Sequence, residues 1–354
     1  MTHKTRLLSN FCVCIAGLAL ASCGGGSSSA SSSPPPVTAV PPPPPPVATA
    51  PARPPVPEAA PEGPDFHPAN KGWALMWSDE FDAATLDASK WSMEIACGGG
   101  GNNERQCYTD RDDNVELING LLRIVALEET YTGINFPIDN TQKTQPYTSG
   151  KILTQDLADW RYGRISIRGK LPEGQGTWPA FWMLGGSGVY GDIWPLLGEI
   201  DIMEAVNLGA RCDDCEGSDG ENHTSNALHF GNPFPDNRMI VSKTTLADNS
   251  NPADAYHVWA IEWGEGIIKW FLDGELYSSF ESEDWFTAAD LDNPNAPYDE
   301  SFYLILNLAI GGNFPEPLNE MGIAESSLPN QLLVDWVRVY QCEEDLETGL
   351  ACME

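Results

Sequence analysis

Short runs that alternate apolar and polar residues dominate this chain, and a period of two is what half-buried β-strands require. Such runs recur from about residue 66 to residue 340, whereas long helical patterns are scarce. Examples are "GLLRIVAL", "YGRISIRGKL", "HVWAIEW" and "QLLVDWVRVY". Asp273 and Gly274 separate two further runs and are typical of a hairpin turn. The pattern predicts one all-β sandwich domain.

The N-terminus has the features of an export signal. Lys4 and Arg6 precede the apolar stretch "FCVCIAGLALA", which is shorter than the roughly 20 apolar residues that a transmembrane helix needs. The following "LASC" resembles a bacterial lipobox, so we expect a lipoprotein signal peptide over residues 1–22 and a lipid on Cys23. The alternative is an ordinary signal peptide with an incidental cysteine. Gly24 after the cysteine would suggest the outer membrane in a Gram-negative cell. We therefore expect an exported protein, held at the outer membrane or cell surface or otherwise secreted.

Composition divides the remainder of the chain. Residues 23–65 are rich in Gly, Ser and Pro without apolar periodicity, which predicts a disordered linker. The folded domain is expected over residues 66–342, followed by a short tail over 343–354. The net charge of -32 argues against nucleic acid or anionic lipid headgroups as partners, leaving the lipid anchor as the only expected membrane contact. Nothing in the sequence requires more than a monomer.

Six cysteines follow the linker, and an even number in an exported domain indicates disulfides. Fifteen pairings are possible, and sequence proximity favours Cys97–Cys107, Cys212–Cys215 and Cys342–Cys352, of which only the first and last are geometrically easy. The "CDDC" segment could instead suggest zinc or redox chemistry, but it lacks a second ligand pair nearby.

The segment "GEIDIMEA" places three acids, Glu199, Asp201 and Glu204, among aliphatic residues typical of a buried strand. Residues two apart share a face of a strand, so Glu199 and Asp201 point the same way and Glu204 the opposite way. A β-bulge near Met203 would return Glu204 to their face. We therefore predict a bulge, and three acids that serve catalysis. A solvated strand edge or a calcium site is the alternative.

Tryptophans are crowded just before this acidic segment. Trp178 and Trp182 lie in "TWPAFWML", and Trp194 lies in "DIWPLLGEI". Aromatic faces pack against the C–H faces of sugar rings, so we expect these side chains to bind sugar. Core packing is the alternative for each of them.

"GEIDIME" resembles the active-site signature of glycoside hydrolase family 16. The resemblance extends in order through "WSDEFD", "GGNNERQCYT", "YTSGKI", "YGRISIRGKLPEGQGTWPAFWML", "ALHFG", "WAIEWGEGIIKWFLDGELY", "LILNLAIGGNFP" and "LLVDWVRVYQC". It covers residues 73–342 and implies a β-jelly-roll sandwich whose concave face forms the substrate cleft.

Within the family the chain is most similar to bacterial endo-β-1,3-glucanases (laminarinases), and the inserted Met203 matches the bulged branch. This implies an extracellular retaining endo-hydrolase of β-1,3-glucan. The same mechanism on agar, carrageenan or mixed-linkage glucan, a transglycosylase, and a non-catalytic glucan-binding protein are the alternatives. The segment "YGRISIRGK" departs from the family pattern, which leaves the roles of Arg164 and Arg168 open; Arg168 is a candidate for substrate binding.

The resemblance assigns Glu199 as nucleophile and Glu204 as general acid/base, with Asp201 between them holding Glu199 in place. It also implies that His229 lies near the acid/base and that Asn102 bonds sugar hydroxyls on the glycone side. No cofactor is expected for catalysis. The resemblance also implies a structural calcium on the convex side, bound largely by backbone oxygens, with Glu80, Gly120 and Asp335 as the positions that we name.

Overall fold

The computed structural model describes residues 50–66, 71–136, 141–186, 188–213, 215 and 220–353. These residues belong to one compact unit, Ala50–Glu354. The predicted signal peptide, residues 1–22, and the predicted lipidation site, Cys23, lie outside the described residues. No helix in the described part of the chain is long and apolar enough to cross a membrane.

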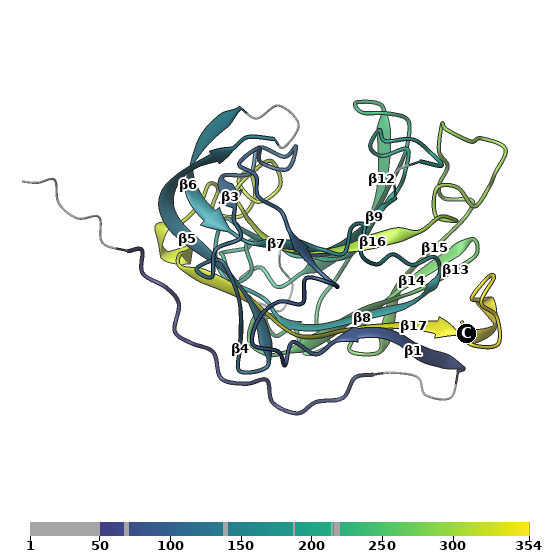
Figure 1. Ribbon diagram of the computed structural model, residues 1–354, viewed down its shortest axis with the longest axis horizontal. Coiled ribbons are helices and arrows are strands. Elements are labelled where there is room, and N and C mark those ends of the chain that lie inside the picture. Colours follow the sequence, from purple (N-terminus) through teal and green to yellow (C-terminus); the bar gives the residue numbers. More distant parts are fainter. Residues whose placement is uncertain are drawn as a thin grey trace, which may run out of the picture. The chain divides into compact units, whose positions relative to one another are not determined.

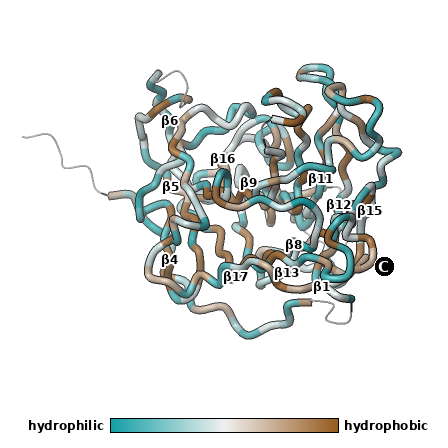
Figure 2. Tube along the Cα trace, turned by 45° about the vertical axis from the view of Figure 1, so that its right-hand side comes forward, coloured by the Kyte–Doolittle hydropathy of each residue, from teal (hydrophilic) through white to brown (hydrophobic). Residues whose placement is uncertain are grey.

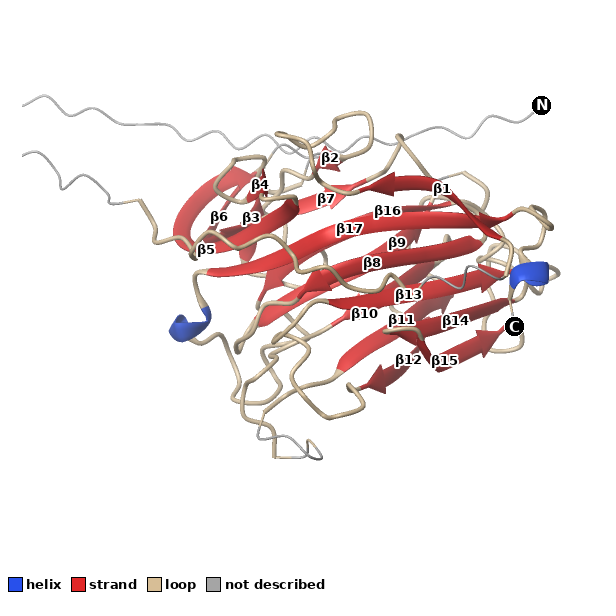
Figure 3. Ribbon diagram, turned by 90° about the horizontal axis from the view of Figure 1, so that it is seen from below, coloured by secondary structure: helices blue, strands red, loops and turns tan. Residues whose placement is uncertain are grey.

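The fold consists of two β-sheets packed face to face, as Figure 3 shows. The ten-stranded sheet runs in the order β15 (Glu275–Glu281), β14 (Ile267–Leu272), β13 (His257–Gly264), β8 (Gly163–Lys170), β17 (Asn330–Cys342), β5 (Leu121–Ile134), β6 (Gln142–Ser149) and β3 (Gln106–Tyr108), with β1 (Trp73–Asp79) paired to β17 and β4 (Val115–Ile118) paired to β5. The seven-stranded sheet runs in the order β12 (Asn237–Thr244), β11 (Thr224–Gly231), β10 (Glu199–Glu204), β9 (Thr177–Gly185), β16 (Phe302–Ile310), β7 (Lys151–Leu153) and β2 (Ser92–Met93). The helices in the described residues are two short 3-10 turns, η1 (Glu325–Ser327) and η2 (Leu350–Cys352). The predicted all-β sandwich is confirmed.

The core lies between the two sheets and follows from the alternation in the sequence. Ile165 and Ile167 of β8 are fully buried, as are Leu304 and Leu306 of β16, whereas their sequence neighbours face away from the core. Burying each such side chain stabilises the fold by about 1.5–3 kcal/mol. In Figure 2 the hydrophobic colour is concentrated along β9, β13, β16 and β17 in the interior. The outward residues of each strand are therefore free to form other surfaces.

Residues 50–66, which we call the strap, run along the ten-stranded sheet beneath β4, β17 and β1 (Figure 1). Arginines of the sheet hold the strap by its backbone. Arg123 donates to the carbonyl oxygens of Pro54 (2.6 Å) and Pro55 (3.1 Å), and Arg168 donates to that of Pro61 (3.0 Å). Residues 50–65 of the predicted linker form neither helix nor strand but are held against the sheet, and residues 23–49 lie outside the described part, so the disorder of the linker stays a prediction. Proline keeps its backbone carbonyl group as a hydrogen-bond acceptor. Contacts made through carbonyl groups need no apolar periodicity, so the sequence pattern did not indicate that this segment binds the sheet.

Three disulfides link the pairs that sequence proximity favours, Cys97–Cys107, Cys212–Cys215 and Cys342–Cys352. The sulfurs of the "CDDC" segment are bonded to each other, so they are not available as thiolate ligands for zinc. The last disulfide ties the tail over residues 343–353 to the end of β17. The Asp273–Gly274 turn joins β14 to β15, as predicted.

Candidate active site

The acidic strand β10 lies inside the seven-stranded sheet, hydrogen-bonded to β9 on one side and β11 on the other. In Figure 1 β12 rises at one end of this sheet, and β3, β5 and β6 of the ten-stranded sheet rise beyond its other end. We call its outward side, on which Glu199 and Glu204 lie half-buried, the concave face. The residues of β10 that alternate with the acids face the opposite sheet and belong to the core.

A bulge interrupts β10 between Asp201 and Glu204. Against β9 the register passes from Asp201 to Met203 without a partner for Ile202, and against β11 it shifts between Asp201 and Glu204. Ile202 and Met203 are consecutive and both fully buried in the core, which an unbroken strand does not allow. The predicted bulge is confirmed, and it returns Glu204 to the face of Asp201.

Each glutamate of β10 accepts a hydrogen bond from a tryptophan indole. Trp194 Nε1 donates to Glu199 Oε2 at 2.7 Å, and Trp178 Nε1 donates to Glu204 Oε1 at 2.8 Å. Trp178 is buried, so it acts on Glu204 and does not offer a broad ring face to a sugar. The sequence predicted that Trp178 and Trp194 bind sugar. The structure shows that each also holds a catalytic carboxyl group through an indole hydrogen bond.

His229 of β11 lies directly opposite Glu199 in the sheet. Its Nε2 is 3.3 Å from Asp201 Oδ2 and 3.6 Å from Glu199 Oε1. Burial opposes protonation of this imidazole, but the carboxylates of Asp201, Glu199 and Glu204 outweigh it and raise the pKa of His229 to about 9. The histidine is therefore a cation at neutral pH and holds the acid cluster together.

The two glutamates differ in their affinity for a proton. Burial, with the charge of Asp201 adding to it, raises the pKa of Glu199 to about 7, opposed by His229 and the Trp194 N–H. The same two causes raise the pKa of Glu204 to about 8, opposed first by the Trp178 N–H. Glu204 is therefore the carboxyl that keeps its proton to higher pH, and Glu199 is the one that ionises first, as acid and nucleophile roles require.

Three polar side chains that were not predicted from the sequence surround Trp182, and we call this group, Asn307, Tyr108 and Lys151, the polar wall. Trp182 Nε1 donates to Asn307 Oδ1 (2.7 Å), and Asn307 Nδ2 donates to the hydroxyl of Tyr108 (3.2 Å). Lys151 Nζ lies 5.1 Å from the Trp182 ring centroid and forms an ion pair with Glu94 (2.8 Å). Asn307 is the single polar residue inside the apolar run "LILNLAI", and that was the signal available.

Asn102 lies in the exposed loop before β3. Its carbonyl oxygen accepts a hydrogen bond from the backbone N–H of Asn313 at 2.8 Å, so it lies beside the loop that follows β16. Contact between Asn102 and a sugar stays a prediction.

Arg168 does not lie on the concave face. It belongs to β8 in the ten-stranded sheet, where it forms an ion pair with Asp335 and donates to the strap. The prediction that Arg168 binds substrate is wrong, because alternation in a strand gives the face of a residue but not the sheet to which the strand belongs.

The carboxylates among the positions named for calcium are paired with arginines, and calcium at these positions stays a prediction. Arg338 donates to both oxygens of Glu80 (3.0 and 2.8 Å), and Arg168 pairs with Asp335. An arginine therefore neutralises each of these two carboxylates, and the side chains alone would not supply the charge that a dication attracts. Gly120 lies in the turn between β4 and β5, in the left-handed region that favours glycine.

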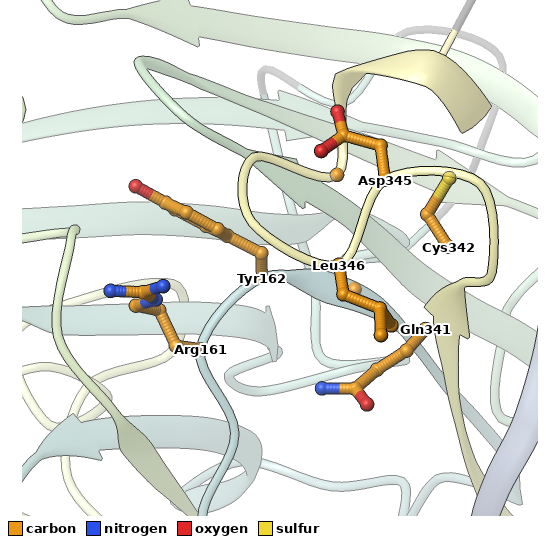
Figure 4. A pocket seen from close by; sticks show the side chains of 8 residues that line it. Arg161, Tyr162, Gln341, Cys342, Asp345 and Leu346 are labelled. Carbon is orange, nitrogen blue, oxygen red and sulfur yellow. The ribbon is translucent and has the colours of Figure 1, made fainter.

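Figure 4 shows a separate small pocket beside the C-terminal segment. Its volume is about 10 Å³, which is room for about one water molecule. Among the residues that line it are Arg161, Tyr162, Gln341, Cys342, Asp345 and Leu346, and none of the lining residues belongs to β10. It has no part in the candidate site.

A model of the glycosyl hydrolases family 16 matches residues 108–299, which is more than half of the chain and includes β10 and its bulge. The chain belongs to glycosyl hydrolase family 16. The β-jelly-roll sandwich that the resemblance implied is the fold of this family member, and the protein is a glycoside hydrolase that needs no cofactor for catalysis.

Individual relatives agree with this family. Glucan endo-1,3-beta-glucosidase A1 of Niallia circulans is 40% identical over 287 residues, which is 79% of this chain but only 39% of that longer protein. Beta-glucanase of Rhodothermus marinus is 38% identical over 278 residues, covering 77% of this chain and 86% of the relative. The solved laminarinase of Rhodothermus marinus superposes with a TM-score of 0.61 at 34% identity, covering 76% of this chain and 97% of that structure.

Proposed function

We propose that this family 16 hydrolase cleaves internal β-1,3 bonds of laminarin-type glucan with retention of configuration. The observation that supports the proposal most strongly is the bulge in β10, which brings Glu199, Asp201 and Glu204 to one face. The glucan substrate is supported by the relatives described above, which act on β-1,3-glucan or β-glucan by name.

In the first step the Glu199 carboxylate donates an electron pair to the anomeric carbon. The bond between that carbon and the glycosidic oxygen breaks, and the Glu204 carboxyl gives its proton to the leaving oxygen. The pKa of both carboxyls is raised, to about 7 for Glu199 and about 8 for Glu204, which agrees with Glu204 holding the proton. The product is a glycosyl ester on Glu199 and a free oligosaccharide.

In the second step Glu204, now a carboxylate, removes a proton from water. The hydroxide oxygen attacks the anomeric carbon and the ester bond to Glu199 breaks, which restores both carboxyl groups. Two inversions at one carbon give net retention. Asp201 and the cationic His229 fix the orientation of Glu199 through both steps, because His229 lies within 3.6 Å of both carboxylates.

Three alternatives keep the same site with a different outcome or substrate. Agar, carrageenan or mixed-linkage glucan would be cleaved by the same mechanism, and a transglycosylase would use a sugar hydroxyl where the hydrolase uses water. A non-catalytic binding protein is disfavoured because both glutamates are present, each with its indole donor.

A reducing-sugar assay on laminarin, lichenan, agarose and carrageenan tests the proposed function. We expect the highest rate on laminarin, and we expect Glu199→Gln to abolish it while laminarin binding remains. Activity on agarose or carrageenan alone would contradict the proposed substrate. Full activity of Glu199→Gln would contradict the proposed mechanism.

We also propose that the protein is exported and anchored by a lipid on Cys23, because the "LASC" segment resembles a lipobox and a Gly/Ser/Pro-rich spacer follows it. Cys23→Ser should move the protein from the membrane fraction to the soluble fraction of the same cells. If the variant stays in the membrane fraction, the lipid is not the anchor.

A further inference from the structure

The outward face of β12, the edge strand of the seven-stranded sheet, continues the catalytic surface. Residues directly opposite one another in antiparallel strands point to the same face. Glu199 lies opposite His229, which lies opposite Met239 of β12. Asp201 lies opposite Ala227, which lies opposite Val241. Two rows therefore lead across the concave face from the acids to Met239 and Val241.

Met239 and Val241 are exposed, at 53% and 49% of their surface, although both are apolar. Half-buried His229 lies between Met239 and Glu199, and the small, buried Ala227 lies between Val241 and Asp201, whereas the row of Glu204 leads through Ser225 to Lys243. Adjacent strands are about 4.8 Å apart, so β12 lies about 10 Å across the sheet from β10. The surface is thus apolar, open and next to the reacting groups, without being part of them.

The other side of β10 is built differently. There Trp182, Asn307 and Tyr108 form a chain of hydrogen bonds, and Lys151 lies over the Trp182 ring. Fixed polar groups of this kind hold a sugar in one orientation. The concave face therefore has one polar, preformed side and one apolar, open side.

Double displacement makes different demands on the two parts of the substrate. The glycone stays bound through both steps because it is esterified to Glu199 in between, whereas the aglycone must leave after the first step. A preformed polar wall suits the part that stays, and an open apolar surface suits the part that leaves. The polar side around Trp182 is accordingly the glycone side.

We infer that Met239 and Val241 form an aglycone subsite that binds the C–H face of a sugar on the leaving side of the scissile bond. At about 10 Å across the sheet from β10, this subsite serves a sugar beyond the one attached to the scissile oxygen. The inference rests on the proposed function and names the part of the glucan that the surface binds. The same surface would receive an acceptor sugar when a sugar hydroxyl replaces water in the second step.

The test is the double variant Met239→Gln/Val241→Thr, which nearly preserves side-chain size on a solvent-facing strand. Two substrates are compared, laminarihexaose, which places sugars on the leaving side, and nitrophenyl laminaribioside, whose leaving group is an aryl ring. Losing apolar contact worth about 1–1.5 kcal/mol corresponds to a roughly five- to tenfold change. We expect the ratio of kcat/KM for the hexaose to that for the aryl glycoside to fall by about that factor.

The control is Met76→Gln, at an equally exposed apolar residue of β1 in the other sheet, 58% exposed, which should leave the ratio unchanged. An unchanged ratio in the double variant overturns the inference, and so does a rising ratio, which would place the surface on the glycone side. These outcomes are separate from the proposed function, since laminarin hydrolysis by the unmodified protein and its loss in Glu199→Gln test that function independently.

Discussion

Trp178 and Trp194 each donate a hydrogen bond to a different catalytic carboxyl, and removing them one at a time should move opposite limbs of the pH profile. The kcat/KM of a retaining hydrolase requires Glu199 ionised and Glu204 protonated, so it falls below the pKa of Glu199 and above that of Glu204. Both indole N–H groups stabilise a carboxylate and lower its pKa. Phenylalanine keeps an aromatic ring but has no N–H.

In Trp178→Phe the pKa of Glu204 rises, so the basic limb moves to higher pH and the active range widens. In Trp194→Phe the pKa of Glu199 rises, so the acid limb moves to higher pH and the range narrows. A hydrogen bond to a charged group is worth about 1.5–3 kcal/mol, and one pKa unit is about 1.4 kcal/mol. We expect shifts of about one unit, since water can partly replace each donor at these half-buried acids.

The assay is the pH dependence of kcat/KM on laminarin, measured with reducing-end detection. Trp182→Phe is the matched control, because that indole donates to Asn307 and not to a catalytic acid, so both limbs should keep their positions. If Trp178→Phe moves the acid limb instead, the roles of the two glutamates are reversed. If neither variant moves a limb, the indoles do not set the pKa values.

Three further predictions follow from charges and contacts. Asp201→Asn removes a charge that raises the pKa of both glutamates, so both limbs should move to lower pH by about one unit, and a move to higher pH would contradict this reasoning. Arg164→Met leaves Glu262 buried without its partner and should lower the free energy of unfolding by about 3–5 kcal/mol in denaturant titrations. Arg164→Met/Glu262→Met should recover most of that loss, and failure to recover would show that the pair is not the cause. Arg123→Ala should release the strap at Pro54 and Pro55 and lower the free energy of unfolding by about 1–3 kcal/mol. An unchanged unfolding midpoint would mean that the strap adds no stability.

The most informative prediction from the sequence was the bulge in β10. It depended on one change of spacing, from two residues between Glu199 and Asp201 to three between Asp201 and Glu204. A strand has a fixed period of two, so an insertion that keeps polar residues on one face has few structural solutions. The disulfide pairs could also be predicted from the sequence, because partners such as Cys342 and Cys352 lie close together along the chain.

Features that depend on distant pairings could not be predicted. The face of Arg168 follows from alternation, but its sheet depends on which strands pair with β8. The strap has no apolar pattern, and its partners, such as Arg123, are far away in the sequence. Asn307 interrupts an apolar run, which indicates a function, but its bond to Trp182 depends on the pairing of β9 with β16. Local sequence patterns therefore predicted β10 and its acids. The polar side chains around Trp182 could not be predicted, because their positions depend on how distant strands pair.

Azide rescue tests the central claim, that β10 presents Glu199 as nucleophile and Glu204 as acid/base on one face. Glu199→Ala and Glu204→Ala are each assayed on nitrophenyl laminaribioside with azide, and the products are identified by proton NMR. In Glu199→Ala azide replaces the nucleophile and inverts the anomeric carbon once, so the account predicts an α-glycosyl azide. In Glu204→Ala azide replaces water in the second step, so it predicts a β-glycosyl azide. The reverse pair of products would exchange the two roles, and α-azide from both variants would contradict double displacement.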